Sequence, residues 1–418
     1  MSYTQPSRDP DGIIRDHDGT IPQNPSVGFK DVRSTWPQYD DDEISAVSEI
    51  LKSGRVNALQ HGDNCSAFES EFAQLCQMPH AIAVANGTLG LELALRGLQV
   101  GPGDEVIVTA RSFIASASCI VNCGASAVFA DIDLTSQNIS AETVKSVMTE
   151  RTRAIIAVHL AGHPCDMDPL CALAQEHGIA IIEDCAQAHG ATYKGRPIGS
   201  FGSASVFSFC TDKIMSTGGE GGMLLLRDMD AYRRAWSYKD HGKDYDLVKQ
   251  KSSGNAFRWI HTSIGSNFRM TEMQAAIGLR QLKKLEIWIE QRRQRAAVLF
   301  DALEDLAAIR VHRPSNQVGH SFYKFYAFID PAKLKPDWSR DRILLEAKRL
   351  GVPCQSGSCP EIYLEQAFNN DNDKSVSLPN AKSLGVTSIL LPVDPTLSIE
   401  DVEYMGQTLR LVVETATA

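Results

Sequence analysis

Two apolar runs, "AIIAVHL" at Ala154–Leu160 and "GIAIIED" at Gly178–Asp184, decide the fold class. Both runs are short, rich in β-branched residues and almost unbroken by polar residues. That pattern is typical of strands that are buried on both faces of a parallel sheet. The two runs and the segment between them therefore predict a βαβ unit.

Runs of the same kind precede this unit and extend the prediction along the chain. They are "AIAVAN" at residues 81–86, "DEVIVTA" at 104–110 and "SAVFADI" at 126–132, and helix-like segments such as "GTLGLELALRGL" separate them. We expect an α/β fold in which helices cover a mainly parallel sheet. Ligands of such sheets bind beyond the carboxyl ends of the strands.

Three regions suggest how the chain divides. Residues 1–26 lack hydrophobic periodicity and are expected to form a flexible extension. A helical pattern runs from Thr271 past Leu299, long enough to connect a large domain (27–290) to a smaller C-terminal α+β domain (291–418). The polar segment 239–267 is expected to be an excursion from the core, and loops of this length are often functional.

Composition excludes several classes of protein. The 418 residues carry a formal net charge of -10, which argues against a nucleic-acid partner because phosphate backbones need a basic surface. The amino-terminal stretch is polar and no apolar run could span a bilayer, so we expect neither a signal peptide nor a membrane partner. The ten cysteines are scattered without a CxxC pair, which favours free thiols and a cytoplasmic protein.

The stretch "FSFCTDKIMSTGGEGGMLLL", Phe207–Leu226, places one lysine, Lys213, between two apolar runs. Most lysines are solvated surface charges. Here buried runs flank the loop on both sides, and its glycines allow a close backbone approach to a ligand. Burial disfavours the ammonium form and makes a lysine amine nucleophilic towards an aldehyde. We therefore hypothesise that Lys213 forms a Schiff base with pyridoxal 5′-phosphate.

That cofactor also needs a carboxylate at its pyridine nitrogen and donors for its phosphate. Asp184 stands at the end of a predicted buried strand. Gly87 and Thr88 begin a helix directly after another strand, where dipole and free N–H groups favour a phosphate. Asp184 and Thr88 could instead be helix caps, so neither residue is specific alone.

Four motifs in this order carry a family resemblance: "VANGTLGLELAL", "EDCAQAHGATYKGRPIGSFG", "FSFCTDKIMSTGGEGG" and "GSNFRMTEMQAAIG". From about Val27 nearly to its end, the chain resembles the DegT/DnrJ/EryC1/StrS aminotransferases, which are sugar aminotransferases of fold type I. The resemblance implies a pyridoxal 5′-phosphate enzyme and a homodimer whose active sites are shared between subunits. No metal is expected at the site.

The resemblance also implies roles for individual residues. Lys213 would form the Schiff base and move the proton, and Asp184 would pair with the pyridinium nitrogen. Gln187, three residues on, would share a helical face with Asp184 and lie near the ring hydroxyl, although a capping or surface role is the alternative. Phe113 would stack on the ring, unless it is a core aromatic.

The phosphate would be bound by residues from several motifs. Ser208 would act together with Thr88 and with the backbone at Gly87 and Leu89. Asn267 would reach the phosphate in the neighbouring subunit, with Arg269 as a possible helper. A monomer would then lack a complete site.

The implied reaction is ping-pong transfer of an amino group from L-glutamate to a nucleotide-linked keto-deoxysugar, for amino-sugar biosynthesis. A cyclitol (keto-inositol) aminotransferase is the alternative that the sequence hardly separates. Sugar dehydratases of the family have histidine in place of the lysine, so Lys213 favours aminotransfer. A non-catalytic regulator should carry a DNA-binding appendage, and a nicotinamide oxidoreductase should carry GxGxxG after a strand; neither pattern is present.

Two further patterns suggest metals only weakly. His159 and His163 have the i, i+4 spacing of a zinc pair, but Gly162 and Pro164 interrupt the helix that the pair would need, and no nearby carboxylate or cysteine completes a set. The acidic pair around Ile132 is expected to be a strand end that enters a turn.

Overall fold

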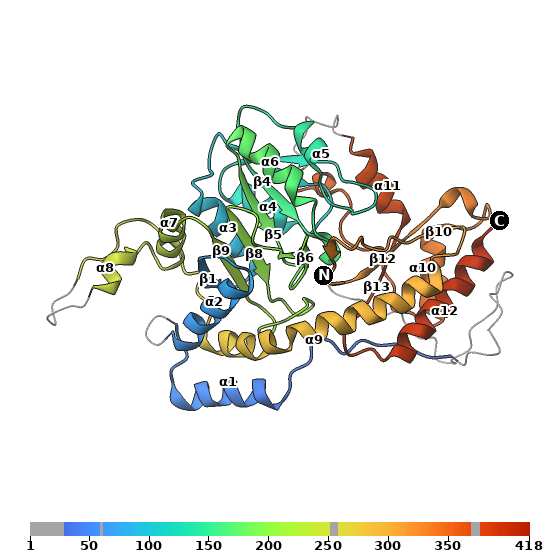
Figure 1. Ribbon diagram of the computed structural model, residues 1–418, viewed down its shortest axis with the longest axis horizontal. Helices are drawn as coiled ribbons and strands as arrows, with labels where there is room; N and C mark the ends of the chain where they lie inside the picture. Colours follow the sequence, from blue (N-terminus) through green and yellow to red (C-terminus); the bar gives the residue numbers. More distant parts are fainter. Residues whose placement is uncertain (1–28, 59–61, 251–257, 369–376) are drawn as a thin grey trace.

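The computed structural model describes residues 29–58, 62–250, 258–368 and 377–418 (Figure 1). The extension predicted at residues 1–26 lies outside these ranges. The main sheet has seven strands in the order β1-β9-β8-β5-β4-β2-β3. All strands except β9 share one direction, which confirms the mainly parallel sheet. Their bounds are β1 His80–Val84, β2 Glu105–Thr109, β3 Ser126–Ala130, β4 Thr152–Val158, β5 Ala180–Asp184, β8 Ala204–Ser208 and β9 Gly222–Leu226.

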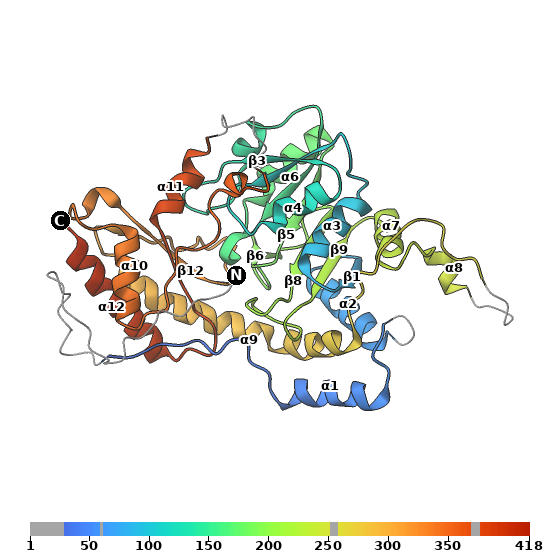
Figure 2. The ribbon, with the colours of Figure 1, turned by 180° about the vertical axis from the view of Figure 1, so that it is seen from behind.

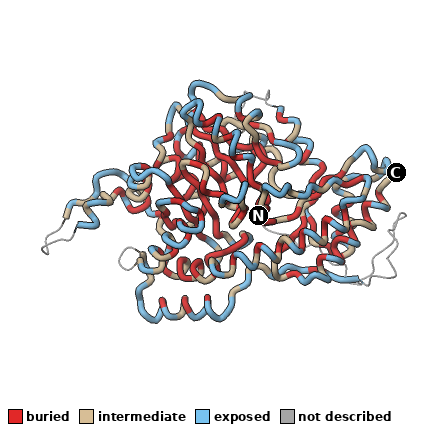
Figure 3. The backbone as a smooth tube through the Cα atoms, in the orientation of Figure 1, coloured by how far each residue is buried: buried red, intermediate tan, exposed pale blue. Residues whose placement is uncertain are grey.

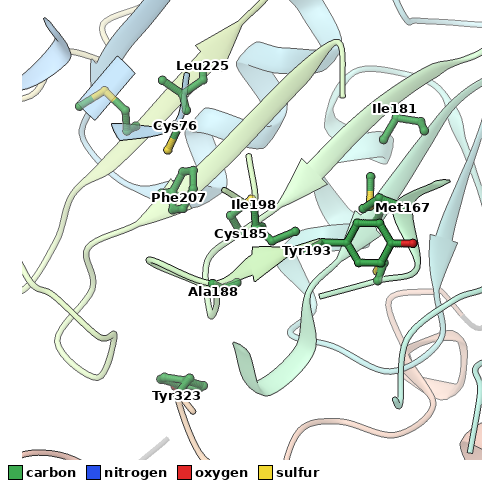
Figure 4. Close-up of a cluster of buried hydrophobic side chains, with 14 of the residues drawn as sticks. Cys76, Met167, Ile181, Cys185, Ala188, Tyr193, Ile198, Phe207, Leu225 and Tyr323 are labelled. Atoms are coloured by element: carbon green, nitrogen blue, oxygen red, sulfur yellow. The ribbon is translucent and has the colours of Figure 1, made fainter. Parts of the chain in front are cut away.

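Helices cover both faces of this sheet, as Figures 1 and 2 show from opposite sides. One core lies under α3 (Gly87–Gly97), α4 (Ala115–Asn122) and α7 (Met229–Lys239). The other lies under α2 (Asp63–Leu75), α6 (Met167–His177) and the long α9 (Glu272–Leu303), with the short α5 (Ala141–Lys145) beside it. Figure 4 shows part of this second core. The unbroken apolar character of the strands follows from burial on both faces (Figure 3).

The C-terminal part forms its own small antiparallel sheet, β10-β12-β13. The last turns of α9 pack with this sheet in a separate core, while its first turns belong to the core of the main sheet. A domain boundary at residue 290 stays a prediction, and it falls inside one continuous helix. The elements of this part are β10 Ile309–Arg310, β12 Phe325–Ile329, β13 Ser388–Leu391, α10 Arg340–Arg349, α11 Pro379–Thr387 and α12 Ile399–Ala416.

Short elements complete the fold. The strand β11 (Val318–Gly319) pairs with β6 (Thr192–Tyr193), which pairs with β7 (Arg196–Pro197), so a third sheet links the C-terminal part to the loop after β5. The helix α1 (Asp41–Ser53) lies along α9 and ends at Gly54, whose φ of 68° is readily adopted by glycine.

The segment after α7 leaves the body of the protein, as predicted for residues 239–267. It carries α8 (Tyr245–Lys249) and projects away from the sheet (Figure 1). At its base, Asp240 accepts hydrogen bonds from Lys243 (2.9 Å) and Arg269 (2.7 Å). Residues 251–257 of the excursion lie outside the described ranges.

Two composition-based expectations can be compared with the structure. All ten cysteines are free thiols. Among the described residues, none of the helices combines the length and the apolar character needed to cross a membrane.

Candidate active site

Asp184 is the last residue of β5, and its carboxylate is almost completely buried. Its Oδ2 accepts a hydrogen bond from the Ser116 hydroxyl (2.8 Å), and its Oδ1 accepts one from the N–H of Ala186 (3.1 Å). Burial raises the pKa of Asp184 above its ordinary value, although these hydrogen bonds oppose the shift. The protein thus holds one carboxylate in a site where a cationic partner would be strongly favoured.

The segment after Asp184 forms turns at residues 185–190, so the predicted helical face shared by Asp184 and Gln187 is wrong, and so is the helix-cap alternative for Asp184. Gln187 is nevertheless buried beside the site. Its Oε1 accepts a hydrogen bond from the N–H of Ala161 (2.7 Å), in the loop after β4. Gln187 is therefore held at the carboxyl edge of the sheet by a neighbouring loop.

The residues predicted to bind the phosphate lie where α3 begins, directly after β1. Asn86 caps the helix, and its side chain accepts a hydrogen bond from the N–H of Leu89 (2.9 Å). The backbone of Leu89 was also predicted to bind the phosphate, but its N–H is engaged by Asn86 within the helix. Gly87 and Thr88 are the first-turn residues whose N–H groups a helix offers to an outside acceptor. The Ser208 side chain packs against Gly87, where an added Cβ would lie 2.8 Å from Ser208 Cβ and 3.3 Å from its Oγ. Gly87 and Ser208, two of the predicted phosphate ligands, are thus in contact, and Thr88 is the next residue of the same helix.

This close packing makes Gly87→Ala a direct test of the phosphate site. Alanine suits a first helical turn better than glycine, so the expected loss comes from crowding beside Ser208 rather than from helix propensity. Overpacking costs about 1–3 kcal/mol, and we expect affinity for pyridoxal 5′-phosphate to fall roughly tenfold. Fluorescence titration of cofactor-stripped protein measures this. Gly101→Ala is the matched control, because its Cβ would meet only Cys123 O, at 3.7 Å. Unchanged affinity in Gly87→Ala would contradict the assignment.

Lys213 lies in the loop between β8 and β9, with its side chain 16% exposed. The N–H of Phe209 donates to Gly221 O (2.8 Å) and the N–H of Thr217 donates to Phe209 O (3.1 Å), which closes the loop at its base. The Trp36 indole N–H donates to the carbonyl of Lys213 (2.7 Å). The loop is therefore fixed by contacts, and the lysine backbone is held by a residue that sequence reasoning missed.

The positions of Phe113 and Asn267 do not test their predicted roles. The side chain of Phe113 is 66% exposed and precedes α4, the helix that supplies Ser116 to Asp184. Asn267 lies in a segment that pairs with the edge strand β1 of its own chain, and its Oδ1 accepts from the N–H of Arg269 (3.4 Å). Arg269 binds Asp240, so its guanidinium already has a partner. Ring stacking by Phe113 and the contact of Asn267 with a neighbouring subunit stay predictions.

A buried acid–histidine pair next to Asp184 was also missed. His159 Nε2 lies 3.1 Å from Glu183 Oε2, and both side chains are fully buried. His159 Nδ1 accepts from the N–H of Cys165 (3.0 Å), which assigns the ring proton to Nε2. Glu183 also accepts from the N–H groups of Gly199, Phe201 and Gly202. The sequence feature that could have indicated this pair is Glu183, a charged residue inside the apolar strand β5.

The prediction that no nearby carboxylate or cysteine completes a set with the histidines is wrong for His159. His159, Glu183 and Cys185 lie close enough to share an ion, although the oxygens of Glu183 are already engaged by four donors. His163 points elsewhere and contacts the carbonyl of Pro164 through Nδ1 (2.9 Å). The side chain of Asp131 accepts from the N–H groups of Asn380 and Ala381 at the start of α11, and Asp133 closes a turn, as predicted.

The arrangement as a whole defines a class of protein. At the carboxyl edge of a mainly parallel sheet, Asp184 ends β5, α3 begins after β1, and β8 ends at Ser208 and leads into the loop of Lys213. These residues fit the pyridine nitrogen, the phosphate and the aldehyde of pyridoxal 5′-phosphate. The protein is a fold type I transferase that depends on this cofactor.

Comparison with known proteins makes the assignment more specific. Residues 37–410 match the DegT/DnrJ/EryC1/StrS aminotransferase family, and the chain belongs to it. GDP-perosamine synthase of Escherichia coli O157:H7 is 33% identical over 375 residues, which cover 89% of this chain and 96% of that protein. The dTDP-3-amino-3,4,6-trideoxy-alpha-D-glucose transaminase of Streptomyces venezuelae is 32% identical, with 90% and 93% covered.

Solved structures agree in fold. The X-ray structure of an aminotransferase from Psychrobacter cryohalolentis has a TM-score of 0.86 and 47% sequence identity, covering 90% of this chain and 97% of that one. The putative sugar aminotransferase Spr1654 from Streptococcus pneumoniae, 26% identical in its PLP form, has a TM-score of 0.82 over 92% of this chain and 99% of its own. The same protein has been solved in its PMP form. The predicted fold, cofactor and enzyme class are confirmed.

Proposed function

We propose that this aminotransferase moves an amino group from L-glutamate to a nucleotide-linked keto-deoxysugar by a ping-pong mechanism, for amino-sugar biosynthesis. The observation that carries the proposal is the arrangement of Asp184 and Lys213 at the carboxyl edge of adjacent strands: Asp184 is the last residue of β5, and Lys213 lies in the loop after β8. The names of two relatives, one a GDP-sugar enzyme and one a dTDP-sugar enzyme, support a nucleotide-linked acceptor.

In this proposal each residue has a separate task. When bound, pyridoxal 5′-phosphate supplies an electron sink for the bond that breaks at the donor's α-carbon. Asp184 holds the proton on the pyridine nitrogen by charge pairing in a buried setting. Gly87, Thr88 and Ser208 bind the phosphate and so orient the ring. Lys213 takes the proton from the α-carbon through Nζ and delivers it to the adjacent cofactor carbon.

L-Glutamate should change the visible spectrum of the purified, cofactor-loaded protein. We expect the band of bound pyridoxal 5′-phosphate to disappear, with one equivalent of 2-oxoglutarate released per site. A panel of GDP- and dTDP-linked keto-deoxysugars, and a keto-inositol, should then be tested for return of the band. If the band returns only with keto-inositol, the acceptor is a cyclitol and not a nucleotide-linked sugar. A band unchanged by every L-amino acid tested would remove the proposed donor reaction.

The proposal includes a homodimer in which Asn267 contacts the cofactor phosphate of the other subunit. Lys213→Ala and Asn267→Ala subunits, each inactive or weak alone, should regain part of the activity when mixed. The reason is that a mixed dimer would contain one site with both Lys213 and Asn267. Activity of mixed and unmixed samples measures this, with mass spectrometry to show that mixed dimers form. Mixed dimers without any recovery would contradict sharing.

We also place the protein in the cytoplasm. Its cysteines are free thiols, several of them in the buried core, which suits a reducing compartment.

A further inference from the structure

The residue directly before Lys213 carries a carboxylate that contacts its amine. Asp212 Oδ1 lies 3.2 Å from Lys213 Nζ. A turn makes this contact possible, because the N–H of Lys213 donates to Cys210 O (3.1 Å) and brings two consecutive side chains to the same side. The Asp212 side chain is 54% exposed while that of Lys213 is 16% exposed. The ion pair therefore joins a mostly buried amine to a partly exposed carboxylate.

A second residue, from the C-terminal part of the chain, completes this contact. The Tyr323 hydroxyl donates a hydrogen bond to Asp212 Oδ2, the oxygen that Lys213 does not use. The ring of Tyr323 also lies under the lysine, with Nζ 5.0 Å from its centroid. The amine thus contacts two residues that contact each other.

Tyr323 is itself fixed in place. It is 7% exposed, its N–H donates to Ala161 O (2.9 Å), and its carbonyl accepts from Arg292 Nη1 (3.3 Å). Ala161 in turn donates its N–H to Gln187. The phenol is therefore tied to the same loop that holds Gln187 beside Asp184, which gives the ion pair a rigid support.

The charge states of Asp212 and Tyr323 follow from their surroundings. Burial acts to raise the pKa of Asp212, but the charge of Lys213 and the hydrogen bond from Tyr323 outweigh it and hold the pKa below its ordinary value. Burial and the Asp212 charge raise the pKa of Tyr323 far above its ordinary value. At neutral pH Asp212 is therefore a carboxylate, and Tyr323 is a neutral phenol that donates a hydrogen bond to it.

We propose that Asp212 and Tyr323 are positioning residues that hold the Lys213 amine whenever it is not bonded to the cofactor. This inference rests on the proposed function of Lys213. The donor's amine must displace the lysine in the first half-reaction, and the released amine then accepts one proton from the α-carbon. The resulting ammonium is stabilised by the Asp212 carboxylate, and it becomes neutral again when the proton passes to the cofactor carbon. The lysine stays free until it displaces the aminated product at the end of the second half-reaction.

Asp212→Asn tests this, since it keeps the shape and removes the charge. In single turnovers of loaded enzyme with L-glutamate, we expect proton transfer to slow on the order of tenfold with little change in the half-saturating glutamate concentration. The isotope effect of α-deuterated glutamate should increase. Asp212→Glu should restore most of the rate, and Tyr323→Phe should reproduce part of the loss. Glu220→Gln, which removes an exposed charge from the same loop, is the matched control.

A second readout does not depend on turnover. Cofactor-stripped protein is mixed with pyridoxal 5′-phosphate, and attachment to Lys213 is trapped by borohydride and located by peptide mass. Asp212→Asn should capture the cofactor about fivefold faster, because the amine no longer has to leave an ion pair worth up to about 1 kcal/mol. A merely structural role would slow capture and proton transfer together.

The outcomes separate this inference from the function on which it rests. Faster capture with slower proton transfer supports the positioning role. Wild-type rates in both assays, or losses in both, overturn it while leaving the transamination proposal intact. Absence of trapped cofactor on Lys213 in the wild-type protein would remove the proposed function itself. If Asp212→Asn does not fold, Tyr323→Phe decides by the same two assays.

Discussion

Lys213→Ala is expected to lower the rate of amino transfer by on the order of 10⁴-fold, the upper end of what a positioned proton-transfer group contributes. The loss follows from geometry. The side chain of Lys213 is mostly buried, and its loop is fixed at both ends by the buried strands β8 and β9. A methyl group in its place can neither bond to an aldehyde nor move a proton.

The measurement is the rate of both half-reactions in single turnovers, together with the visible spectrum of the loaded protein. Lys213→Arg should be nearly as defective, because a guanidinium stays protonated and cannot act as the base. Lys382→Ala, an exposed lysine of α11, is the control for loss of a positive charge. Since phosphate contacts are untouched, both Lys213 variants should still bind cofactor. Normal turnover in Lys213→Ala would end the assignment.

The main features of the fold could be predicted because they depend on local patterns. Strands buried on both faces read as unbroken apolar runs, and their carboxyl ends brought Gly87, Asp184 and Ser208 to one edge of the sheet. The long helical period after Thr271 likewise became α9, capped by Thr271 itself. The sequence predicted these residues one strand at a time, and the sheet brings them together at one edge.

The predictions that were wrong, and the site residues that the sequence did not reveal, concern contacts between distant segments of the chain. The residues after Asp184 form turns because this segment passes against α9. A Cβ on Gly190 would lie 2.1 Å from Ile289 Cδ1, and Gly190 itself has a φ of 66°. A spacing of three residues carries no information about such a constraint. Trp36 and Tyr323 reach the lysine loop from segments far away along the chain, so no local pattern could indicate them.

Asp184→Asn should leave the cofactor bound but slow proton transfer on the order of 10²- to 10³-fold, the usual loss when one electrostatic stabiliser is removed from a buried site. A neutral amide cannot balance a protonated pyridine nitrogen. The substitution keeps the local hydrogen bonds, because the amide oxygen can accept from Ala186 and the amide nitrogen can donate to Ser116, whose hydroxyl can turn towards Ser112. Single-turnover rates with L-glutamate measure the effect, and Asp230→Asn on the surface of α7 is the control.

The same variant should have the opposite effect on the stability of cofactor-stripped protein. Because burial raises the pKa of Asp184 in the folded state, the folded protein disfavours the carboxylate that the unfolded chain forms readily. Below the ordinary pKa of 3.8 both states are protonated and no stability is lost. As the pH rises above that value, wild-type stability falls until the folded-state pKa is passed. Asp184→Asn should therefore be more stable by about 1 kcal/mol at neutral pH, and equal to wild type in acid.

Denaturant unfolding at a series of pH values distinguishes the two explanations of a slow variant. A gain in stability that grows with pH, together with slow proton transfer, means that Asp184 is kept for its charge at a cost to the fold. A variant that is slow and also less stable at neutral pH would show that its hydrogen bonds to Ser116 and Ala186, rather than its charge, are what the site needs. Single-turnover rates equal to wild type would remove Asp184 from its role at the pyridine nitrogen altogether.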